Sequence, residues 1–247
     1  AYSQPSKVIE INKALVEDTA SDKGVSDHPS KLGVMLAYDL GTKYNKPMYS
    51  LNPINVDEFC DYARITGIKG LYRHAQSHCL NQKAIASIHA KSKGSTYEEG
   101  NYIVCHIDGG ISITAHEKGL MIDGTEGAAG EGPFSPTRVG TIPVMEMMDY
   151  MDQGHDTKEC RKLYTRTGGF VSHFGTSNSD IIHKMVEEKD PKATLIWNSM
   201  CYNICKSIGE MAAVLEGKVD GILLTGGLVR FKDLVAFIEK KCSWIAP

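Results

Sequence analysis

VCHIDGGISITAHEKGLMIDGT, residues Val104–Thr125, alternates apolar and polar side chains on both sides of a glycine pair. This period of two is typical of β-strands, and the link HEKG favours a tight hairpin turn. We therefore predict three short strands, Tyr102–Ile107, Ile111–His116 and Gly119–Ile122. A hairpin alone requires neither the two glycines nor the aspartate beside them, so the stretch also raises a question of function.

Both sides of this stretch are predicted to contain helices. Six segments are predicted to be helical: residues 28–45, 77–93, 144–153, 157–165, 179–189 and 191–216. The last is the clearest, because Asp190 can cap it, Pro191 suits its first turn and Gly217 can end it. Pro47–Phe59 predicts a short strand and a turn, and Val219–Gly227 predicts a strand that runs into a Thr-Gly-Gly turn. This order indicates a mixed α/β domain with helices packed on a sheet.

Two of these helices carry apolar residues at helical spacing. In residues 77–93 one face holds Leu80, Ala84, Ile85 and Ile88, and in residues 191–216 the predicted buried stripe holds Met200, Ile204, Ile208, Met211 and Leu215. Between the third predicted strand and the next helix lies Gly124–Pro143, which is rich in glycine and proline. Because this segment lies between ordered elements, it is predicted to be a long functional loop.

Composition and charge exclude several classes of protein. The 247 residues carry a net charge of −3, which gives no electrostatic basis for binding nucleic acid or an anionic membrane. No apolar run approaches the length of a membrane-spanning helix, about 18–20 residues. The seven cysteines form no CxxC pair, which favours a reducing, cytoplasmic compartment over a disulfide framework. Cys201 and Cys205, four residues apart, are either metal ligands or two small residues of the core.

Two glycine turns suit an anion. Asp108–Ser112 (DGGIS) and Thr225–Gly227 (TGG) each follow an apolar strand. Glycine lets the backbone approach a ligand closely and point its N–H groups at negative charge. Each pair alone is also compatible with a simple tight turn. Together, at two strand ends far apart in the sequence, they fit a nucleotide held between two loops.

Several longer motifs carry a family resemblance: HCLNQKAIA (His78–Ala86), HIDGGIS (His106–Ser112), GEGPFSPTRVGTIP (Gly130–Pro143), GEMAAVLEGKVDGILLTGG (Gly209–Gly227), HPSKLG (His28–Gly33) and NPINVDEFCDYARITG (Asn52–Gly67). The chain resembles butyrate kinases, the short-chain carboxylate kinases related to acetate kinase. The resemblance implies the actin-like, acetate kinase-like α/β fold with ATP between two lobes. It also implies Mg²⁺, a homo-oligomer, and phosphoryl transfer between ATP and a carboxylate to give ADP and an acyl phosphate.

The resemblance implies a division of the chain. Residues 1–58 are expected to be a remnant of the first α/β lobe, and residues 59–247 a complete second lobe that carries the glycine turns. The family begins with a strand and an Asn-x-Gly-Ser phosphate loop and continues beyond residue 247 with an acidic, metal-associated segment. Neither is present here, so we expect a fragment of a longer protein.

The resemblance also implies roles for individual residues. Arg138 matches an arginine that contacts the transferring phosphoryl group, His78 a nearby histidine, and Asn52 a position that helps to place metal and carboxylate. Residues expected to face the nucleotide are His106, Asp108, Gly109, Gly110, Ser112, Thr225, Gly226, Gly227 and Asn178. By residue type alone, Arg138 would more often be a solvated surface residue, His78 a residue at a helix end, and His106 equally often a structural one. No metal ligand is assigned.

Several matched positions differ from the family pattern. Asn52 replaces an aspartate and Ser77 a phenylalanine, while Asn178 and Asp180 replace an aspartate and an arginine near the adenine. Asp108 replaces a glycine. A carboxylate ~5 Å from a phosphate oxygen costs roughly 3 kcal/mol per charge pair at an effective dielectric constant of ~20, unless Mg²⁺ lies between them. The alternative is that Asp108 points away and caps a turn.

Two functional hypotheses therefore stand beside each other. The chain is either an active acyl phosphate-forming kinase or a catalytically inactive relative that acts as a binding or assembly subunit. An unrelated binding domain with fortuitous glycine turns is a third interpretation. The altered positions leave the length of the acyl chain open.

Overall fold

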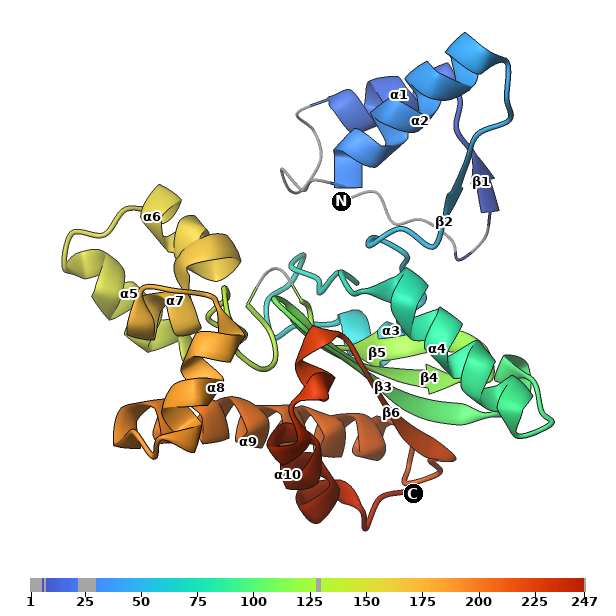
Figure 1. Ribbon diagram of the computed structural model, residues 1–247. Coiled ribbons are helices and arrows are strands. Elements are labelled where there is room, and N and C mark those ends of the chain that lie inside the picture. The colour runs from blue at the N-terminus through green and yellow to red at the C-terminus, as the bar shows by residue number, and fades with distance from the viewer. Residues whose placement is uncertain (1–5, 7, 22–29, 128–129, 247) are drawn as a thin grey trace.

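A small unit forms the N-terminal part of the molecule in the computed structural model, which describes residues 6, 8–21, 30–127 and 130–246 (Figure 1). Its elements are β1 (Val8–Glu10), α1 (Lys13–Ala20), α2 (Ser30–Tyr44) and β2 (Tyr49–Leu51). Strands β1 and β2 pair antiparallel, and α1 packs on α2. The helix predicted at 28–45 and the strand predicted within 47–59 are confirmed, although residues 28 and 29 lie outside the described residues.

The main sheet has four strands in the order β5-β4-β3-β6. The strands are β3 (Asn101–Ile107), β4 (Ile111–Glu117), β5 (Leu120–Gly124) and β6 (Gly221–Thr225). All neighbours pair antiparallel except β3 and β6, which are parallel. Lys118 and Gly119, both with positive φ, form the two-residue turn between β4 and β5. The predicted strands and the tight hairpin turn are confirmed.

The remaining predicted helices are also present. They are α4 (Cys79–Ser92), α5 (Val144–Asp152), α6 (Thr157–Lys162) with a π-helical extension (Leu163–Thr167), α8 (Ser179–Glu187) and α9 (Pro191–Val214). The sequence analysis did not predict five further helical segments. They are α3 (Asp61–Arg64), α7 (Phe170–Phe174), α10 (Lys232–Cys242) and the 3-10 turns Tyr97–Glu99 and Gly227–Arg230. The described residues between β5 and α5 form neither helix nor strand, as predicted for the long loop.

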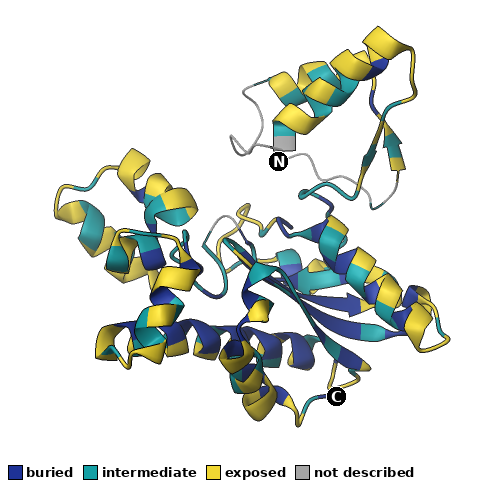
Figure 2. Cartoon of the chain, in the orientation of Figure 1, coloured by how far each residue is buried: buried dark blue, intermediate teal, exposed yellow. Residues whose placement is uncertain are grey.

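Helix α9 covers one face of the main sheet, and α10 packs against α9 (Figure 1). The Asp190 carboxylate accepts a hydrogen bond from the Ala193 N–H, and Pro191 begins the helix, as predicted. The predicted stripe is buried, since Met200, Ile204, Ile208, Met211 and Leu215 are at most 4% exposed. This apolar layer is the dark region beneath the sheet in Figure 2.

Helix α4 lies on the opposite face and presents a different side from the one its apolar residues suggest. Leu80 and Ile88 are 50% and 65% exposed and Ala84 is exposed, so most of the apolar face identified in the sequence points away from the sheet. Ile85 alone of that face packs on the apolar cluster between α4 and the sheet. The buried residues are Cys79, Gln82, Lys83, Ala86 and Ala90. Gln82 faces inward because its Nε2 donates to Ser112 O and Oγ at 3.1 Å. Ala86 and Ala90 belong to an apolar cluster with residues of β3 and β6.

The segment after β2 runs beside β5. The Cys60 N–H donates to Ile122 O at 2.9 Å, and Met121 N–H donates to the Glu58 carboxylate at 2.8 Å. Glu58 also pairs with Lys83 of α4 at 2.7 Å. These contacts fasten the end of the N-terminal part to the main sheet, while the division of the chain at residue 58 stays a prediction.

Candidate active site

The two glycine turns lie side by side at one end of the main sheet. Strand β3 leads into Asp108–Gly110, and β6 leads into Thr225–Gly227. The parallel register pairs His106 with Thr225, so both strands end together. Sequence reasoning placed both turns at strand ends, and the pairing of β3 with β6 is what brings them together.

Asp108 connects the two turns. Its Oδ1 accepts a hydrogen bond from the Gly109 N–H at 2.7 Å, and its Oδ2 accepts one from the Gly227 N–H at 2.6 Å. Desolvation alone would raise the pKa of this carboxyl, but the two backbone hydrogen bonds, helped by His106 and His78, lower it overall. Asp108 therefore caps its own turn, as the alternative proposed, but it points across to the second turn rather than away.

Two histidine rings stack beside these turns. The ring centroids of His78 and His106 are 3.8 Å apart, with 13° between the ring planes. His78 Nδ1 lies 2.7 Å from Ser112 Oγ, and His106 Nδ1 lies 2.9 Å from Asn81 Oδ1. Burial lowers the pKa of His106, against the opposing effect of Asp108. The neutral ring is thereby favoured, and its Nδ1–H donates to Asn81, a residue that the sequence analysis did not single out.

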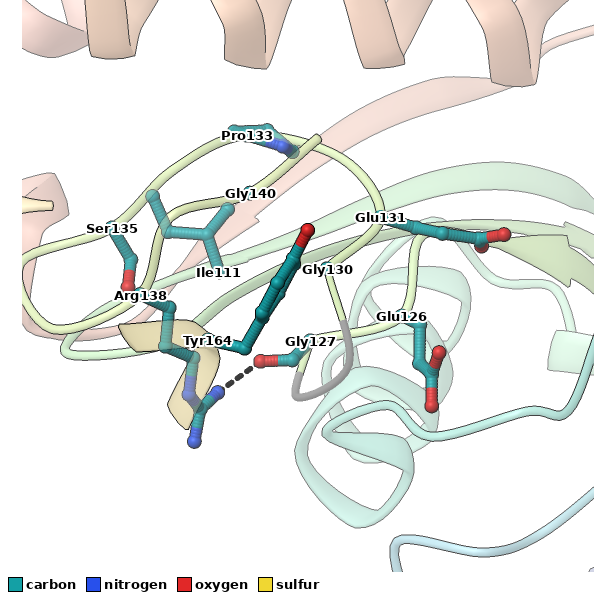
Figure 3. A pocket seen from close by; sticks show the side chains of 10 residues that line it. All are labelled: Ile111, Glu126, Gly127, Gly130, Glu131, Pro133, Ser135, Arg138, Gly140 and Tyr164. Carbon is teal, nitrogen blue, oxygen red and sulfur yellow. Dashed lines mark hydrogen bonds between the residues drawn. The ribbon is translucent and has the colours of Figure 1, made fainter. Parts of the chain in front are cut away.

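Arg138 lies against the first glycine turn. A Cβ atom on Gly110 would overlap the guanidinium group, so glycine is needed for this approach. Arg138 Nη1 donates to Gly127 O, the dashed contact in Figure 3, and its buried Nε has no hydrogen-bond partner. Among the described residues no carboxylate forms an ion pair with Arg138. Burial lowers the pKa of this guanidinium, and a half-buried cation without an acidic partner suits an anionic ligand.

Arg138 also lines a hollow that the long loop surrounds (Figure 3). Two carboxyl groups and the phenol ring of Tyr164 share this lining. Glu131 is occupied by Arg73, with Nε–Oε1 at 2.8 Å. Burial, with a contribution from Glu131, raises the pKa of Glu126 to about 7. Glu126 and Glu131 were not singled out in the sequence, because isolated acidic residues in a loop carry no periodic signal.

Two predicted residues make their polar contacts elsewhere. Asn52 Oδ1 accepts a hydrogen bond from Ser6 Oγ at 2.8 Å. Asn178 caps α8 by accepting from the Asp180 and Ile181 N–H groups. In the part of the chain that the structure describes, no hydrogen bond joins either residue to His78 or Arg138. Their proposed roles rest on the resemblance alone.

A link from α8 to the second glycine turn runs through Asp180 instead. Its Oδ1 lies 2.7 Å from Arg230 Nη2, and Arg230 Nη1 donates to Gly227 O at 2.8 Å. The acid that stands where the family has an arginine is thus paired with an arginine from the turn that follows β6. Sequence reasoning noted Asp180 but not Arg230, since the two are 50 positions apart.

The cysteines of α9 lie in the core. Cys201 is fully buried, and the half-buried Cys205 packs against the same apolar cluster, which also contains Cys242 of α10. Among the described residues no cluster of three or more His, Cys, Asp or Glu side chains has the arrangement of a metal site. Over the same residues, no helix combines the length and apolar character needed to cross a membrane.

The family follows from sequence comparison. A model of the acetokinase family matches residues 59–235. The chain belongs to the acetokinase family. The chain is 40% identical over 238 residues to a curated relative from Enterococcus faecalis. That relative is named probable butyrate kinase. The alignment covers 96% of this chain and 66% of that relative, so the chain spans just under two thirds of the relative's length.

Solved structures show the same fold. An acetate kinase from Porphyromonas gingivalis matches 98% of this acetokinase-family chain with a TM-score of 0.84 and 18% identity, over 63% of its own length. A propionate kinase from Francisella tularensis matches with a TM-score of 0.82 and 18% identity, over 65% of its own length. The predicted α/β fold of the actin-like, acetate kinase type is confirmed.

Proposed function

We propose that this acetokinase-family chain belongs to a kinase that transfers a phosphoryl group between ATP and butyrate or a related short-chain acid. A carboxylate oxygen would attack the γ-phosphorus while the bond to the β-phosphate oxygen breaks, giving an acyl phosphate and ADP without net proton transfer. The observation that carries the proposal is Arg138, a half-buried guanidinium beside a glycine turn with no acidic partner among the described residues.

The residues near Arg138 have complementary parts in this reaction. The transferring phosphoryl group spreads negative charge over its oxygens, and an arginine fixed by backbone contacts stabilises that charge without reorganising. His78 adds a second polar group, and its ring is oriented by Ser112 and by stacking on His106. Glycines 109 and 110 and the turn at Gly226 and Gly227 let the backbone approach phosphates.

ATP and Mg²⁺ are the expected co-substrate and cofactor. Bound Mg²⁺ neutralises phosphate charge, and Asp108 is the carboxylate at the glycine turns that would face it. We place Asn52 near the carboxylate substrate, and Thr225 and Asn178 on the nucleoside side, from the family resemblance. From the same resemblance and the free cysteines, we expect a homo-oligomer in the cytoplasm.

One observation favours a second candidate function. The Asp108 carboxylate takes up N–H groups of both glycine turns, where a phosphate would otherwise bind. If Asp108 keeps these two hydrogen bonds, the chain would be a catalytically inactive member of the family. It would then act as a binding or assembly subunit.

An assay for acyl phosphate distinguishes the two functions. The chain is incubated with Mg-ATP and a series of short-chain acids, and acyl phosphate is trapped with hydroxylamine. The kinase proposal expects turnover, and Arg138→Ala is expected to lower kcat by about 10²–10³-fold, because it removes a charge-stabilising donor. The matched control is Arg161→Ala, an exposed arginine of α6, which should retain activity. Absence of turnover with every acid would favour the inactive relative.

A further inference from the structure

The carboxylate of Asp108 accepts hydrogen bonds from backbone N–H groups of both glycine turns. Oδ1 accepts from the Gly109 N–H at 2.7 Å and Oδ2 from the Gly227 N–H at 2.6 Å. Both oxygens are therefore held, one by each turn. Backbone N–H groups that converge on two oxygens of one anion are the arrangement by which glycine turns bind phosphate.

The second turn is shaped to accept this carboxylate. Gly226 has a φ of 100°, and a Cβ atom on it would overlap the backbone of Ile107. A Cβ atom on Gly227 would lie 2.8 Å from Asp108 Oδ2. Glycine at both positions is thus what allows β3 and the Asp108 side chain to approach the turn so closely.

The surroundings favour the ionised carboxylate. The N–H groups of Gly109 and Gly227 lower the pKa of Asp108 against the effect of desolvation, and the stacked His78 and His106 rings lie beside it. The Arg138 guanidinium adds positive charge to the same region, since it opposes protonation of His106. A solvent-exposed anion therefore already sits at the N–H-rich end of the sheet, in the region of Arg138.

We propose that Asp108 is an internal anion that occupies the phosphate site between the two glycine turns, so that nucleotide phosphates bind there only by displacing it. The nucleotide as ligand rests on the proposed function, whereas the anion site does not. Without Mg²⁺, a carboxylate ~5 Å from a phosphate costs about a hundredfold in affinity at an effective dielectric constant of ~20. Consequently, without Mg²⁺ the affinity of the chain for adenosine, AMP and ATP should not rise with the number of phosphates.

Calorimetric titration of the full chain with pyrophosphate, adenosine, AMP and ATP, without Mg²⁺, tests this proposal. Asp108→Gly should bind ATP and pyrophosphate about a hundredfold more tightly than the unsubstituted chain, with adenosine affinity unchanged. Asp108→Asn, which removes only the charge, should gain about tenfold and serves if the glycine variant does not fold. The matched control is Asp220→Asn, whose carboxylate accepts the Asn101 N–H at 2.7 Å at the other end of β3 and β6, and which should change nothing.

The outcomes separate this inference from the kinase proposal. Equal affinity for ATP and pyrophosphate in the unsubstituted chain and both Asp108 variants would overturn the internal anion, whether or not acyl phosphate forms. A gain in pyrophosphate and ATP affinity in the Asp108 variants, without acyl phosphate formation in the assay above, would support the internal anion and contradict the kinase. If no variant binds pyrophosphate or ATP, there is no anion site between the turns and both proposals fail.

Discussion

The two faces of strand β4 are built from opposite kinds of residue, although both are buried. Along β4 the residues alternate: Ile111, Ile113 and Ala115 face α9, whereas Ser112, Thr114 and His116 face α4. All six are at most 2% exposed. The α9 face of β4 is held by apolar packing and its α4 face, the polar face, by hydrogen bonds. On the neighbouring strands, Val104 and Leu223 pack on α4 through apolar contacts. Along β4, one face therefore contributes mainly to the apolar core, whereas the other orients residues of the candidate site.

The polar face forms a network that leads toward the site. Tyr97 Oη lies 2.6 Å from His116 Nδ1, and His116 Nε2 lies 2.7 Å from Thr114 Oγ1. Further along the same strand, Ser112 contacts both Gln82 and His78. Buried polar groups of this kind require partners, since an unpaired one is costly. The network therefore fixes the position of the His78 ring.

The largest expected effect is on the apolar face. Ile204→Ala removes buried methylene and methyl groups from the centre of α9, where Ile204 is fully buried. We expect the free energy of unfolding to fall by about 2–5 kcal/mol, because lost burial and a new cavity add. Chemical denaturation of the unsubstituted chain and of Ile204→Ala measures this loss.

Its control lies on α4. Ile88→Ala is the same substitution at a position that is 65% exposed, and it should change the unfolding free energy by less than about 0.5 kcal/mol. Equal losses for the two variants would contradict the assignment of stability to the α9 face.

An intermediate effect is expected on the polar face, as a dependence on pH. Burial, with a smaller contribution from Lys83, lowers the pKa of His116 from 6.5 to about 3. Below pH 6.5, His116 therefore binds a proton in the unfolded state but stays neutral in the folded state. The free energy of unfolding falls as the pH drops below this value. Between pH 7 and 5 this one group should cost about 2 kcal/mol.

Comparison with His116→Gln isolates that contribution. Glu126, with a pKa raised to about 7 by burial, gives the opposite slope, because its folded state gains a proton first as the pH falls. Because Glu126 is present in both the unsubstituted chain and His116→Gln, its contribution cancels in the difference between their unfolding free energies. If that difference is the same at pH 7 and pH 5, His116 is not held neutral by burial.

The smallest effect is expected at Gln82. Its Nε2 donates to Ser112, but its buried Oε1 has no hydrogen-bond partner. Gln82→Met conserves shape and removes both the contact and the unpaired oxygen, so the two effects offset and the stability loss should stay within about 1 kcal/mol. Thermal unfolding checks this value. A loss of several kcal/mol in stability would contradict this balance. Because the substitution also frees the Ser112 hydroxyl, it should lower kcat in the acyl phosphate assay if the proposed kinase activity is present.

The apolar face could be predicted from the sequence, whereas the polar face could not. The stripe of α9 is read directly from Ile204 and its neighbours at helical spacing. The same rule fails on α4, because Leu80 and Ile88 follow helical spacing but face outward. The inward residues, Gln82 and Lys83, gain their partners only from strands and loops far away in the sequence. Periodicity identifies burial by hydrophobicity and carries no information about burial by hydrogen bonding.

The site was predictable to a similar degree. The glycine turns and Arg138 could be found in the sequence, because glycine marks turns and the motifs around them are distinctive. The partner of Asp108 could not, since Gly227 lies 119 positions away. Asn81 and Glu126 lacked any local signal, being single polar residues on a helix and in a loop.

The parallel pairing of β3 with β6 also sets an order of assembly. Short turns join β3, β4 and β5, so these strands can pair as soon as they are made. Strand β6 is needed to bring Gly227 to Asp108, and contacts between such distant segments form late because closing a long loop costs entropy. During synthesis, the anion-facing end of the sheet stays incomplete until β6 has left the ribosome. A nascent chain therefore gains the β3–β5 meander and the helices that precede β6 before it gains a surface that any phosphate could recognise.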